Sequence, residues 1–365
     1  MDQTSPSPRS WDAVIVGASF AGLAAATELA GAGRVLLVDR DPVGEGETSA
    51  CAAPLNLLEG MGLAEAVEQV HDHGVLHAPN GRAYRFRMRH PFATFDYSAL
   101  CRILFARSGA EFLQATASGL AGPDTVSTSC GEHRAPVLID ASGWRAVLAA
   151  RSQPGSSGRN AARSVGIELR LPGGGDGLHF WLHHEAMTDG YAWDFPAGGH
   201  RRVGILTYGA SGGLRQRLEQ FLGHTVETRS LHGGSLPARL PTGVSGGRIF
   251  MVGDSAGQCL PLSGEGIRPA LLYGLLAGRR ARQVLGGELS LNSALAAHSR
   301  AVDRTRSTYA LLSLVQRGVK RASRRSALPL AWLCGASPLA WPAESAYWAI
   351  ARPELVSSLS SPART

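Results

Sequence analysis

A strand–turn–helix–strand pattern close to the N-terminus constrains the fold of this chain more than any other feature. Ala13 to Gly17 (AVIVG) is a short β-branched run that ends in glycine, and Leu23 to Leu29 is a run of strong helix formers. A second buried strand is predicted from Val35 to Asp39 (VLLVD). This order within about 30 residues is typical of a parallel β-α-β crossover unit. The pattern therefore predicts an α/β fold built around a parallel sheet.

The turn of this unit has the spacing of a nucleotide-binding fingerprint. Gly17-Ala-Ser-Phe-Ala-Gly22 stands where a G-x-G-x-x-G belongs, with Ser19 in place of the central glycine. Gly17 permits a tight turn, Gly22 lets helix and strand approach closely, and the helix N-terminus attracts a pyrophosphate. Asp39 can accept hydrogen bonds from the adenosine ribose. The cofactor-binding residues predicted here are Gly17, Ala18, Ser19, Phe20, Ala21, Gly22, Asp39 and Arg40.

A second Gly-rich segment, which reads GDSAGQCLPLSGEGI, distinguishes between the dinucleotides that such a fingerprint can bind. Asp254 ends a predicted strand, and Pro261 shapes the loop that follows it. A predicted helix then opens at Gly264, Gly266 and Ile267, and its N-terminus can face a pyrophosphate or a flavin. A lone fingerprint does not separate FAD from NAD, but a dinucleotide as long as FAD needs a second contact of this kind. We therefore expect FAD, held non-covalently between the two sites.

The predicted cofactor-binding elements return along the chain, which indicates a discontinuous domain. Buried strands are predicted at Val137–Ala141 (VLIDA) and Arg248–Asp254 (RIFMVGD), and short strands with turns fill Val165 to about Leu240 between them. The expected fold class is α/β. It comprises a Rossmann-like FAD-binding domain (1–80, 96–155 and 241–290), a second, mainly β-sheet substrate domain (81–95 and 156–240), and a C-terminal helical segment (291–365).

Four segments carry a resemblance to a known family. They are GASFAGLAAA at Gly17 to Ala26, DASGWR at Asp140 to Arg145, YAWDFP at Tyr191 to Pro196, and GDSAGQCLPLSGEGI at Gly253 to Ile267. In this order they resemble the geranylgeranyl reductase family of FAD-dependent oxidoreductases, within the flavoprotein superfamily that shares the para-hydroxybenzoate hydroxylase architecture. The resemblance implies that Asp254 binds the ribityl or ribose end of FAD and that Arg102 supports the cofactor.

Three aromatic side chains of the YAWDFP segment share one face of a strand, because they alternate with Ala192 and Asp194. They can form either a plain hydrophobic sheet face or the wall of a substrate cavity over the flavin, as the resemblance implies. Trp193 and Phe195 are the predicted substrate-binding residues. Tyr191 and Cys51 are the predicted catalytic residues, as donors of the proton that a reduction needs, and an ordered water is the alternative donor.

The resemblance implies reduction of C=C bonds in an isoprenoid, polyene or other hydrophobic small molecule by hydride transfer from reduced flavin. The electrons would come from NAD(P)H or from a separate reductase, because the sequence contains no second nucleotide fingerprint. Two alternatives stay open: a flavin monooxygenase or epoxidase acting on a hydrophobic or aromatic intermediate, and a non-catalytic flavin-binding interaction protein. Flavin halogenases of similar fold depend on a lysine that activates hypohalous acid. Halogenation is therefore disfavoured, because the sole lysine of this sequence, Lys320, lies in the basic tail.

Two departures from the family pattern leave the substrate open. The family often has Cys-Gly-Gly where this chain has Cys51-Ala52-Ala53, and it tends to follow the F-P with a G-x-G where this chain has Gly204-Ile205-Leu206. Neither departure affects the expected flavin site.

The charge and the cysteine content limit where the protein can be located and which partners it can have. The 365 residues carry a formal charge of +7, but residues 291–365 hold 10 Lys+Arg against 3 Asp+Glu, so the excess is local. This argues against a nucleic-acid-binding domain and leaves peripheral membrane contact or a solvated helical cap as alternatives for the tail. The five cysteines form no C-x-x-C pair, which fits a reducing compartment and predicts no metal site. The expected location is the cytoplasm.

Overall fold

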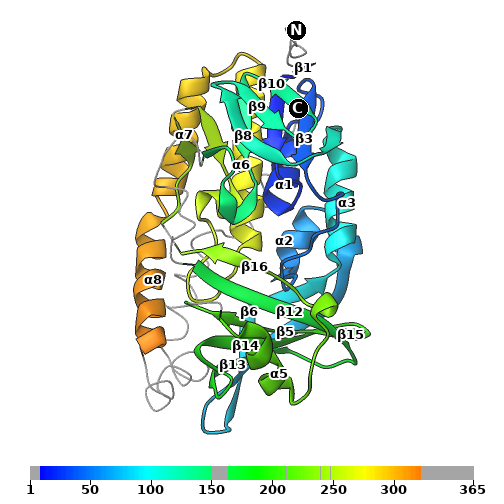
Figure 1. Cartoon of the computed structure of the whole chain (residues 1–365), viewed down its shortest axis with the longest axis vertical. Coiled ribbons are helices and arrows are strands. Elements are labelled where there is room, and N and C mark those ends of the chain that lie inside the picture. Colours follow the sequence, from blue (N-terminus) through cyan, green and yellow to red (C-terminus); the bar gives the residue numbers. More distant parts are fainter. Residues whose placement is uncertain (1–8, 150–162, 210–211, 239, 247, 322–365) are drawn as a thin grey trace, which may run out of the picture.

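The computed structural model describes residues 9–149, 163–209, 212–238, 240–246 and 248–321. Its described strands form three sheets, of six, eight and four strands. The α-helices of the described residues are α1 (Phe20–Glu28), α2 (Leu55–Gly60), α3 (Tyr97–Ser108), α5 (Leu214–Leu222), α6 (Ile267–Leu285), α7 (Leu291–Asp303) and α8 (Arg306–Arg321). Figure 1 shows α1, α6 and α7 in the upper half of an elongated molecule and the eight-stranded sheet in the lower half. Helix α8 runs along one side.

The six-stranded sheet brings together the segments that the sequence marked as cofactor-binding. Its strand order is β17-β18-β11-β2-β3-β7, and all pairs are parallel except β17 with β18. The strands are β17 (Val244–Ser245), β18 (Ile249–Met251), β11 (Val137–Asp140), β2 (Ala13–Val16), β3 (Val35–Asp39) and β7 (Glu111–Gln114). Ligands bind beyond the carboxyl ends of strands in such sheets, so the ends of β2, β3, β11 and β18 define the expected cofactor edge.

Helices α1 and α6 pack closely against each other beside this sheet. A Cβ at Gly274 would lie 2.4 Å from the Ala21 carbonyl oxygen, and one at Gly278 would lie 2.4 Å from the Ala25 carbonyl oxygen. Only glycine fits at either position, because any side chain would collide with the backbone of α1. The two helices are therefore in backbone contact, although 247 positions separate their first residues, Phe20 and Ile267.

The eight-stranded sheet is mostly antiparallel and follows the order β16-β12-β15-β14-β13-β5-β6-β4. Its strands are β16 (His232–Pro237), β12 (Arg163–Pro172), β15 (His200–Thr207), β14 (Met187–Ala197), β13 (Leu178–His184), β5 (Val67–His77), β6 (Ala83–Phe95) and β4 (Ala52–Pro54). One face packs against α5 through Val203, Ile205 and Leu218. The opposite face carries Tyr191, Trp193 and Phe195, as period-two alternation requires.

A small four-stranded sheet completes the upper half, with the order β1-β10-β9-β8. Its strands are β1 (Arg9–Ser10), β10 (Gly131–Arg134), β9 (Thr125–Thr128) and β8 (Ala117–Gly122). Among the residues described, no helix is long and apolar enough to span a membrane. The expected fold class, a Rossmann-like α/β domain with a further sheet and a helical C-terminal part, is confirmed. The predicted domain boundaries stay predictions, and residues 322–365 of the helical segment lie outside the described residues.

Candidate active site

One cavity of about 1640 Å³ lies between the carboxyl edge of the six-stranded sheet and the aromatic face of the eight-stranded sheet. One end is polar and glycine-rich, with Gly17, Asp39 and Asp254 in its lining. The other end is aromatic, with Phe180 and Trp193 among its lining residues. A space with one polar and one apolar end suits a long molecule that carries a charged group and a hydrophobic partner.

The β2–α1 turn forms the polar end through close backbone packing. Gly17 has a φ of +111°, and a Cβ there would lie 2.2 Å from the Ala141 carbonyl oxygen. Helix α1 begins at Phe20 with Ser19 as its N-cap residue, and both residues line the cavity. Because the side chain of Ser19 caps no backbone N–H, the positive end of the helix dipole faces the cavity uncompensated by that residue.

The Asp39 carboxylate ties the end of β3 to this turn. Its Oδ2 accepts a hydrogen bond from the Ala18 backbone N–H at 2.6 Å, and its Oδ1 accepts one from the Asp41 N–H at 3.2 Å. A carboxyl group has about four lone-pair positions, so further acceptor capacity remains for ribose hydroxyls. This arrangement fits the adenosine and pyrophosphate half of FAD.

The second glycine-rich segment approaches the cavity from α6. A Cβ at Gly266 would lie 3.6 Å from Asp254 Oδ1, so the start of α6 and this carboxylate are neighbours. The preceding loop is held by side chains from elsewhere, since the Tyr208 hydroxyl donates to the Leu262 carbonyl at 2.6 Å and the Gln316 amide oxygen accepts from the Leu262 N–H at 2.7 Å. The two separated motifs therefore converge on one cavity.

The cavity brings together most residues that the sequence singled out. Those that line it are Gly17, Ala18, Ser19, Phe20, Ala21, Asp39, Arg40, Cys51, Tyr191, Trp193, Phe195, Asp254, Gly264, Gly266 and Ile267. Three predicted residues stand outside the lining. Gly22 packs against the turn, where a Cβ would collide with the Gly17 carbonyl oxygen at 1.8 Å. Pro261 belongs to the loop before α6, and Arg102 is exposed on α3.

The aromatic wall rests on β14. Tyr191, Trp193 and Phe195 have ring centroids 5.9 and 6.3 Å apart in sequence order. The Tyr191 hydroxyl donates to the Ser263 carbonyl, which links this wall to the loop before α6. Burial, followed by the neighbouring Tyr208, raises the pKa of Tyr191 well above its usual value, so the phenol stays protonated at neutral pH.

Cys51 sits between the two ends of the cavity in a strained backbone conformation, with a φ of 48°. Its side chain is fully buried, and its Sγ lies 3.0 Å from Glu47 Oε1 as a hydrogen-bond donor. Burial raises the pKa of Cys51 well above its usual range, and the Arg202 guanidinium only partly opposes that effect. The group is therefore a thiol at neutral pH and a poor nucleophile.

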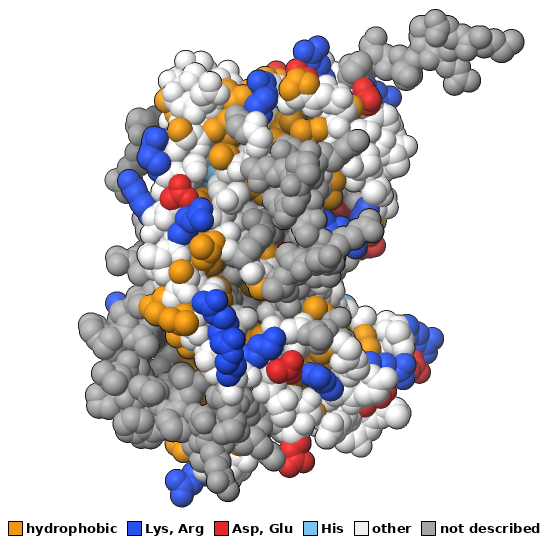
Figure 2. All heavy atoms as spheres, turned by 60° about the vertical axis from the view of Figure 1, so that its left-hand side comes forward, with side chains coloured by type: hydrophobic (Ala, Val, Ile, Leu, Met, Phe, Trp, Pro, Cys, Tyr) orange, Lys and Arg blue, Asp and Glu red, His pale blue; other side chains and the backbone are white. Residues whose placement is uncertain are grey.

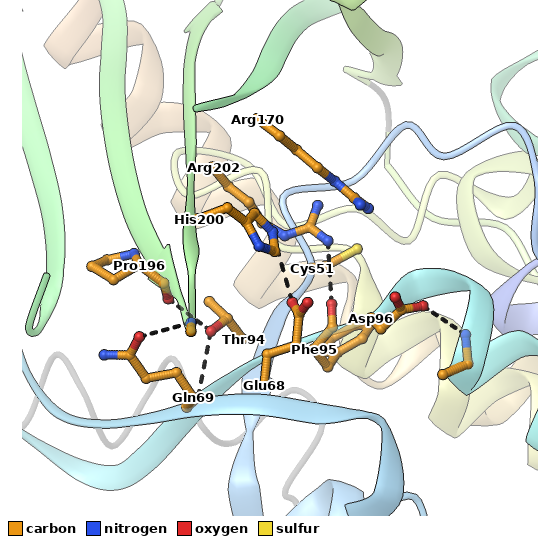
Figure 3. A network of polar contacts seen from close by, with 12 residues as sticks. Cys51, Glu68, Gln69, Thr94, Phe95, Asp96, Arg170, Pro196, His200 and Arg202 are labelled. Carbon is orange, nitrogen blue, oxygen red and sulfur yellow. Dashed lines mark hydrogen bonds and ion pairs between the residues drawn. The ribbon is translucent and has the colours of Figure 1, made fainter. Parts of the chain in front are cut away.

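A buried ionic cluster beside Cys51 was missed at the level of sequence. Arg202, which is completely buried, lies 2.5 Å from Glu47 Oε1 and 3.2 Å from Glu168 Oε1 through its Nη1. Its Nη2 donates to the Phe95 carbonyl at 3.3 Å, and Figure 3 shows the guanidinium close to the Cys51 sulfur. Arg170 reaches Glu47 Oε2 at 2.6 Å. The only signal in the sequence was an alternation of charged and apolar residues, which also describes a solvated strand face.

Comparisons with known proteins agree with this geometry. No protein-family model matches the chain. A digeranylgeranylglycerophospholipid reductase of Methanopyrus kandleri is 26% identical over 316 residues, which cover 75% of this chain and 78% of the relative. A menaquinone reductase of Mycobacterium tuberculosis is 28% identical over 327 residues, covering 75% and 76%.

Solved structures share the fold over nearly the whole chain. A geranylgeranyl bacteriochlorophyll reductase-like protein of Thermoplasma acidophilum superposes with a TM-score of 0.81 at 16% identity, covering 96% of this chain and 98% of the other. A probable FAD-dependent monooxygenase from Pseudomonas aeruginosa gives a TM-score of 0.66 at 15% identity, covering 87% and 98%. The same fold is thus shared with a reductase-like protein and with a probable monooxygenase, so the fold alone does not decide between these activities.

Proposed function

We propose that this chain is an FAD-dependent oxidoreductase of the geranylgeranyl reductase family and that it reduces C=C bonds of an isoprenoid or a similar polyene molecule. The relatives named as reductases support the family and the enzyme class that the motifs predicted. The observation that carries the substrate proposal is the aromatic end of the cavity, which continues directly from the predicted flavin site.

We assign the polar end of the cavity to the cofactor. The α1 N-terminus and the Gly17 turn would hold the pyrophosphate, Asp39 the adenosine ribose, and Asp254 the ribityl end. When bound, FAD in its reduced form supplies the two electrons of the reduction. Everything else is supplied by the chain, which must bind the substrate, exclude water and provide a proton.

The aromatic end would orient the substrate and keep the site dry. Phe195 contacts both Phe180 and Trp193, with ring centroids 5.2 and 6.3 Å apart. Such a wall binds an extended hydrocarbon by apolar contact, and it fixes which double bond lies over the flavin.

Two side chains of the lining can hold the required proton at neutral pH. The Cys51 Sγ–H points to Glu47 Oε1, and the Tyr191 hydroxyl is bonded to the Ser263 carbonyl. Because both groups have raised pKa values, each would give up its proton only as negative charge develops on the neighbouring substrate carbon. We keep both as candidate catalytic residues.

A direct test uses purified, FAD-loaded protein with geranylgeraniol as the probe. After anaerobic reduction with dithionite, we expect products heavier by two hydrogen atoms for each saturated double bond, detected by mass spectrometry. If the probe stays fully unsaturated and the flavin stays reduced, the proposal is wrong. Bleaching of the yellow protein by NADPH alone would identify the donor as NAD(P)H, whereas its persistence would point to a separate reductase.

The shared fold with a monooxygenase supports one rival, in which oxygen is consumed and an epoxide or hydroxyl is formed. Oxygen uptake coupled to probe turnover would favour that rival, and a flavin that binds but reacts with neither substrate nor donor would favour a non-catalytic interaction protein.

We further propose a cytoplasmic location with peripheral membrane contact through α8. Leu311 and Leu314 are 56% and 59% exposed, and Leu311 also lines the cavity. Every charged residue of α8 is basic: Arg306, Arg317, Lys320 and Arg321. Figure 2, which turns this side of the molecule forward, shows basic side chains next to hydrophobic ones. Flotation with anionic liposomes should fall in a Leu311→Ser/Leu314→Ser variant that still binds FAD, and equal flotation would end the membrane proposal.

A further inference from the structure

A buried carboxylate stands in the wall of the aromatic end of the cavity. Glu168 on β12 lines the cavity, yet its side chain is only 3% exposed. A charge in such a place is costly unless it is fully paired. Three groups contact it: Trp193 Nε1 donates to Oε2 at 2.8 Å, Arg202 Nη1 lies 3.2 Å from Oε1, and His232 Nε2 lies 3.0 Å from Oε1.

Glycines allow the Trp193 indole to reach this carboxylate across the sheet. Gly204 on β15 lies between Trp193 on β14 and Glu168 on β12, as the partner of both. A Cβ at Gly204 would lie 2.3 Å from Trp193 Cζ2, and one at Gly166 would lie 3.6 Å from Trp193 Cη2. The indole therefore lies flat over the glycine strand positions instead of projecting into the cavity.

The far side of Glu168 is anchored as well. Arg202 forms ion pairs with both Glu168 and Glu47, and Arg170 on β12 forms a further ion pair with Glu47. Two carboxylates and two guanidinium groups balance in charge, so this pairing offsets the cost of burying the two carboxylates and holds them in place. Figure 3 shows the side chains of Arg170 and Arg202 both ending near Cys51.

We propose that Glu168 is a positioning residue for the substrate cavity: it holds the Trp193 indole flat along the wall and so sets the space left for the substrate over the flavin. This rests on the proposed function, because Trp193 is expected to contact the substrate there. Glu168 acts through Trp193, and its role is to fix the shape of the cavity, with no part in proton transfer.

The geometry requires a carboxylate at this position. Glu168 accepts hydrogen bonds on both oxygens, and every partner is a donor. A glutamine offers one acceptor oxygen and one NH₂ donor. In Glu168→Gln, an N–H therefore faces either the indole N–H or the guanidinium, and the indole is displaced. Trp193→Phe removes the indole N–H, and in that background the glutamine can turn its oxygen to Arg202 and His232 without conflict.

A double-mutant cycle tests the proposal on FAD-loaded protein. The variants are Glu168→Gln, Trp193→Phe and the double variant, and the matched control is Glu227→Gln, whose carboxylate pairs with Arg229 on the surface. We expect Glu168→Gln to raise the Kd for geranylgeraniol about tenfold in the wild-type background and less than about twofold in the Trp193→Phe background, a coupling of at least about fivefold, or about 1 kcal/mol. The Kd for FAD should stay within about twofold throughout.

A second readout needs no substrate. In ¹⁵N-tryptophan-labelled protein, the Trp193 indole signal is identified by its absence from the Trp193→Phe spectrum. We expect this signal to shift and its N–H to exchange with solvent faster in Glu168→Gln, and to be unchanged in Glu227→Gln. An unchanged signal in Glu168→Gln, or equal effects of Glu168→Gln on geranylgeraniol binding in both backgrounds, would overturn the inference. If wild-type protein does not bind geranylgeraniol while the indole signal responds as expected, the proposed substrate class fails and the positioning role stands.

Discussion

Asp39 and Ala18 are joined by a hydrogen bond of 2.6 Å from the Ala18 backbone N–H to the Asp39 carboxylate, so the end of β3 holds the glycine turn that opens α1. The same side chain accepts from the Asp41 N–H. One residue thus shapes the turn and presents an acceptor to the cavity. Removing the Asp39 carboxylate should therefore weaken the cofactor site in two ways, by disturbing the glycine turn and by removing the expected ribose contact.

We expect Asp39→Asn to weaken FAD binding by about 10- to 100-fold, because one acceptor oxygen becomes an NH₂ group that faces a backbone N–H. Flavin fluorescence quenching on titration measures the effect. Asp12→Asn is the matched control, since Asp12 Oδ2 accepts from the Arg34 N–H at 2.7 Å outside the cavity lining. Asp12→Asn should lower stability but leave the FAD affinity unchanged, and equal loss of FAD binding in both variants would contradict this role for Asp39.

Gly17→Ala and Gly109→Ala form a second pair. Both glycines have positive φ, 111° and 62°, but a Cβ at Gly17 meets the Ala141 carbonyl oxygen whereas one at Gly109 meets nothing within 4 Å. Gly109→Ala should cost only about 1 kcal/mol of unfolding free energy, the usual cost of a left-handed alanine. Gly17→Ala should abolish FAD retention or soluble expression. Retained yellow colour and normal melting in Gly17→Ala would show that the turn opens without cost.

Alkylation at pH 8 should separate the cysteines by burial. Cys130 is exposed, whereas Cys51, Cys101 and Cys259 are buried, with pKa values raised by desolvation, that of Cys101 to about 12. Because the thiolate is the reactive form, Cys130 should react with iodoacetamide at least about tenfold faster than the three buried thiols. Peptide mapping reads each site, and unfolding in guanidinium should equalise the rates. Rapid labelling of Cys51 in the folded protein would exclude its assignment as a protonated acid.

Acid should destabilise the chain through His298. This residue is fully buried, and burial lowers its pKa from 6.5 to about 4, against the Met251 carbonyl at 3.1 Å from Nε2. Above pH 6.5 the imidazole is neutral in both states, so its contribution is complete there. Between pH 6.5 and 4 the unfolded state binds more protons, and stability falls by up to about 3 kcal/mol as pH decreases.

Denaturant titrations of His298→Gln measure this effect, since glutamine retains a donor for the Met251 carbonyl and does not titrate. The variant should lose less stability than wild type between pH 6.5 and 4, and His224→Gln, at an exposed histidine, should follow wild type. Parallel curves for wild type and His298→Gln would exclude His298 as the titrating group.

Local patterns were sufficient for the cofactor edge of the fold. The β2–α1–β3 unit and the start of α6 follow from glycine spacing, strand-forming runs and a terminal carboxylate, all within short windows of sequence. Helix α1 begins at Phe20, three positions before the predicted run at Leu23, because the chain becomes helical directly after Ser19, whose backbone is still extended. The resemblance of the YAWDFP segment also located the aromatic wall.

Long-range pairing could not be read in the same way. Strand β5 lies parallel to β13, about 100 positions later, and nothing in the composition of either strand specifies that partner. The cluster of Glu47, Glu168 and Arg202 is similar, because each residue alone has the pattern of a solvated charge. Only the tertiary fold brings the three together, with Arg202 and Glu168 buried and Glu47 largely covered.

The glycine contacts between α1 and α6 have a consequence for the cofactor. Each helix presents its first residues to the cavity, and the contacts at Gly274 and Gly278 lie further along α6, away from the lining. The backbones meet there with no side chain between them. The distance between the two positively polarised helix N-termini is therefore set by helix contacts that lie outside the cavity. A bulkier residue at either glycine would move the N-termini of α1 and α6 apart. A diphosphate could then contact one helix N-terminus or the other, but not both.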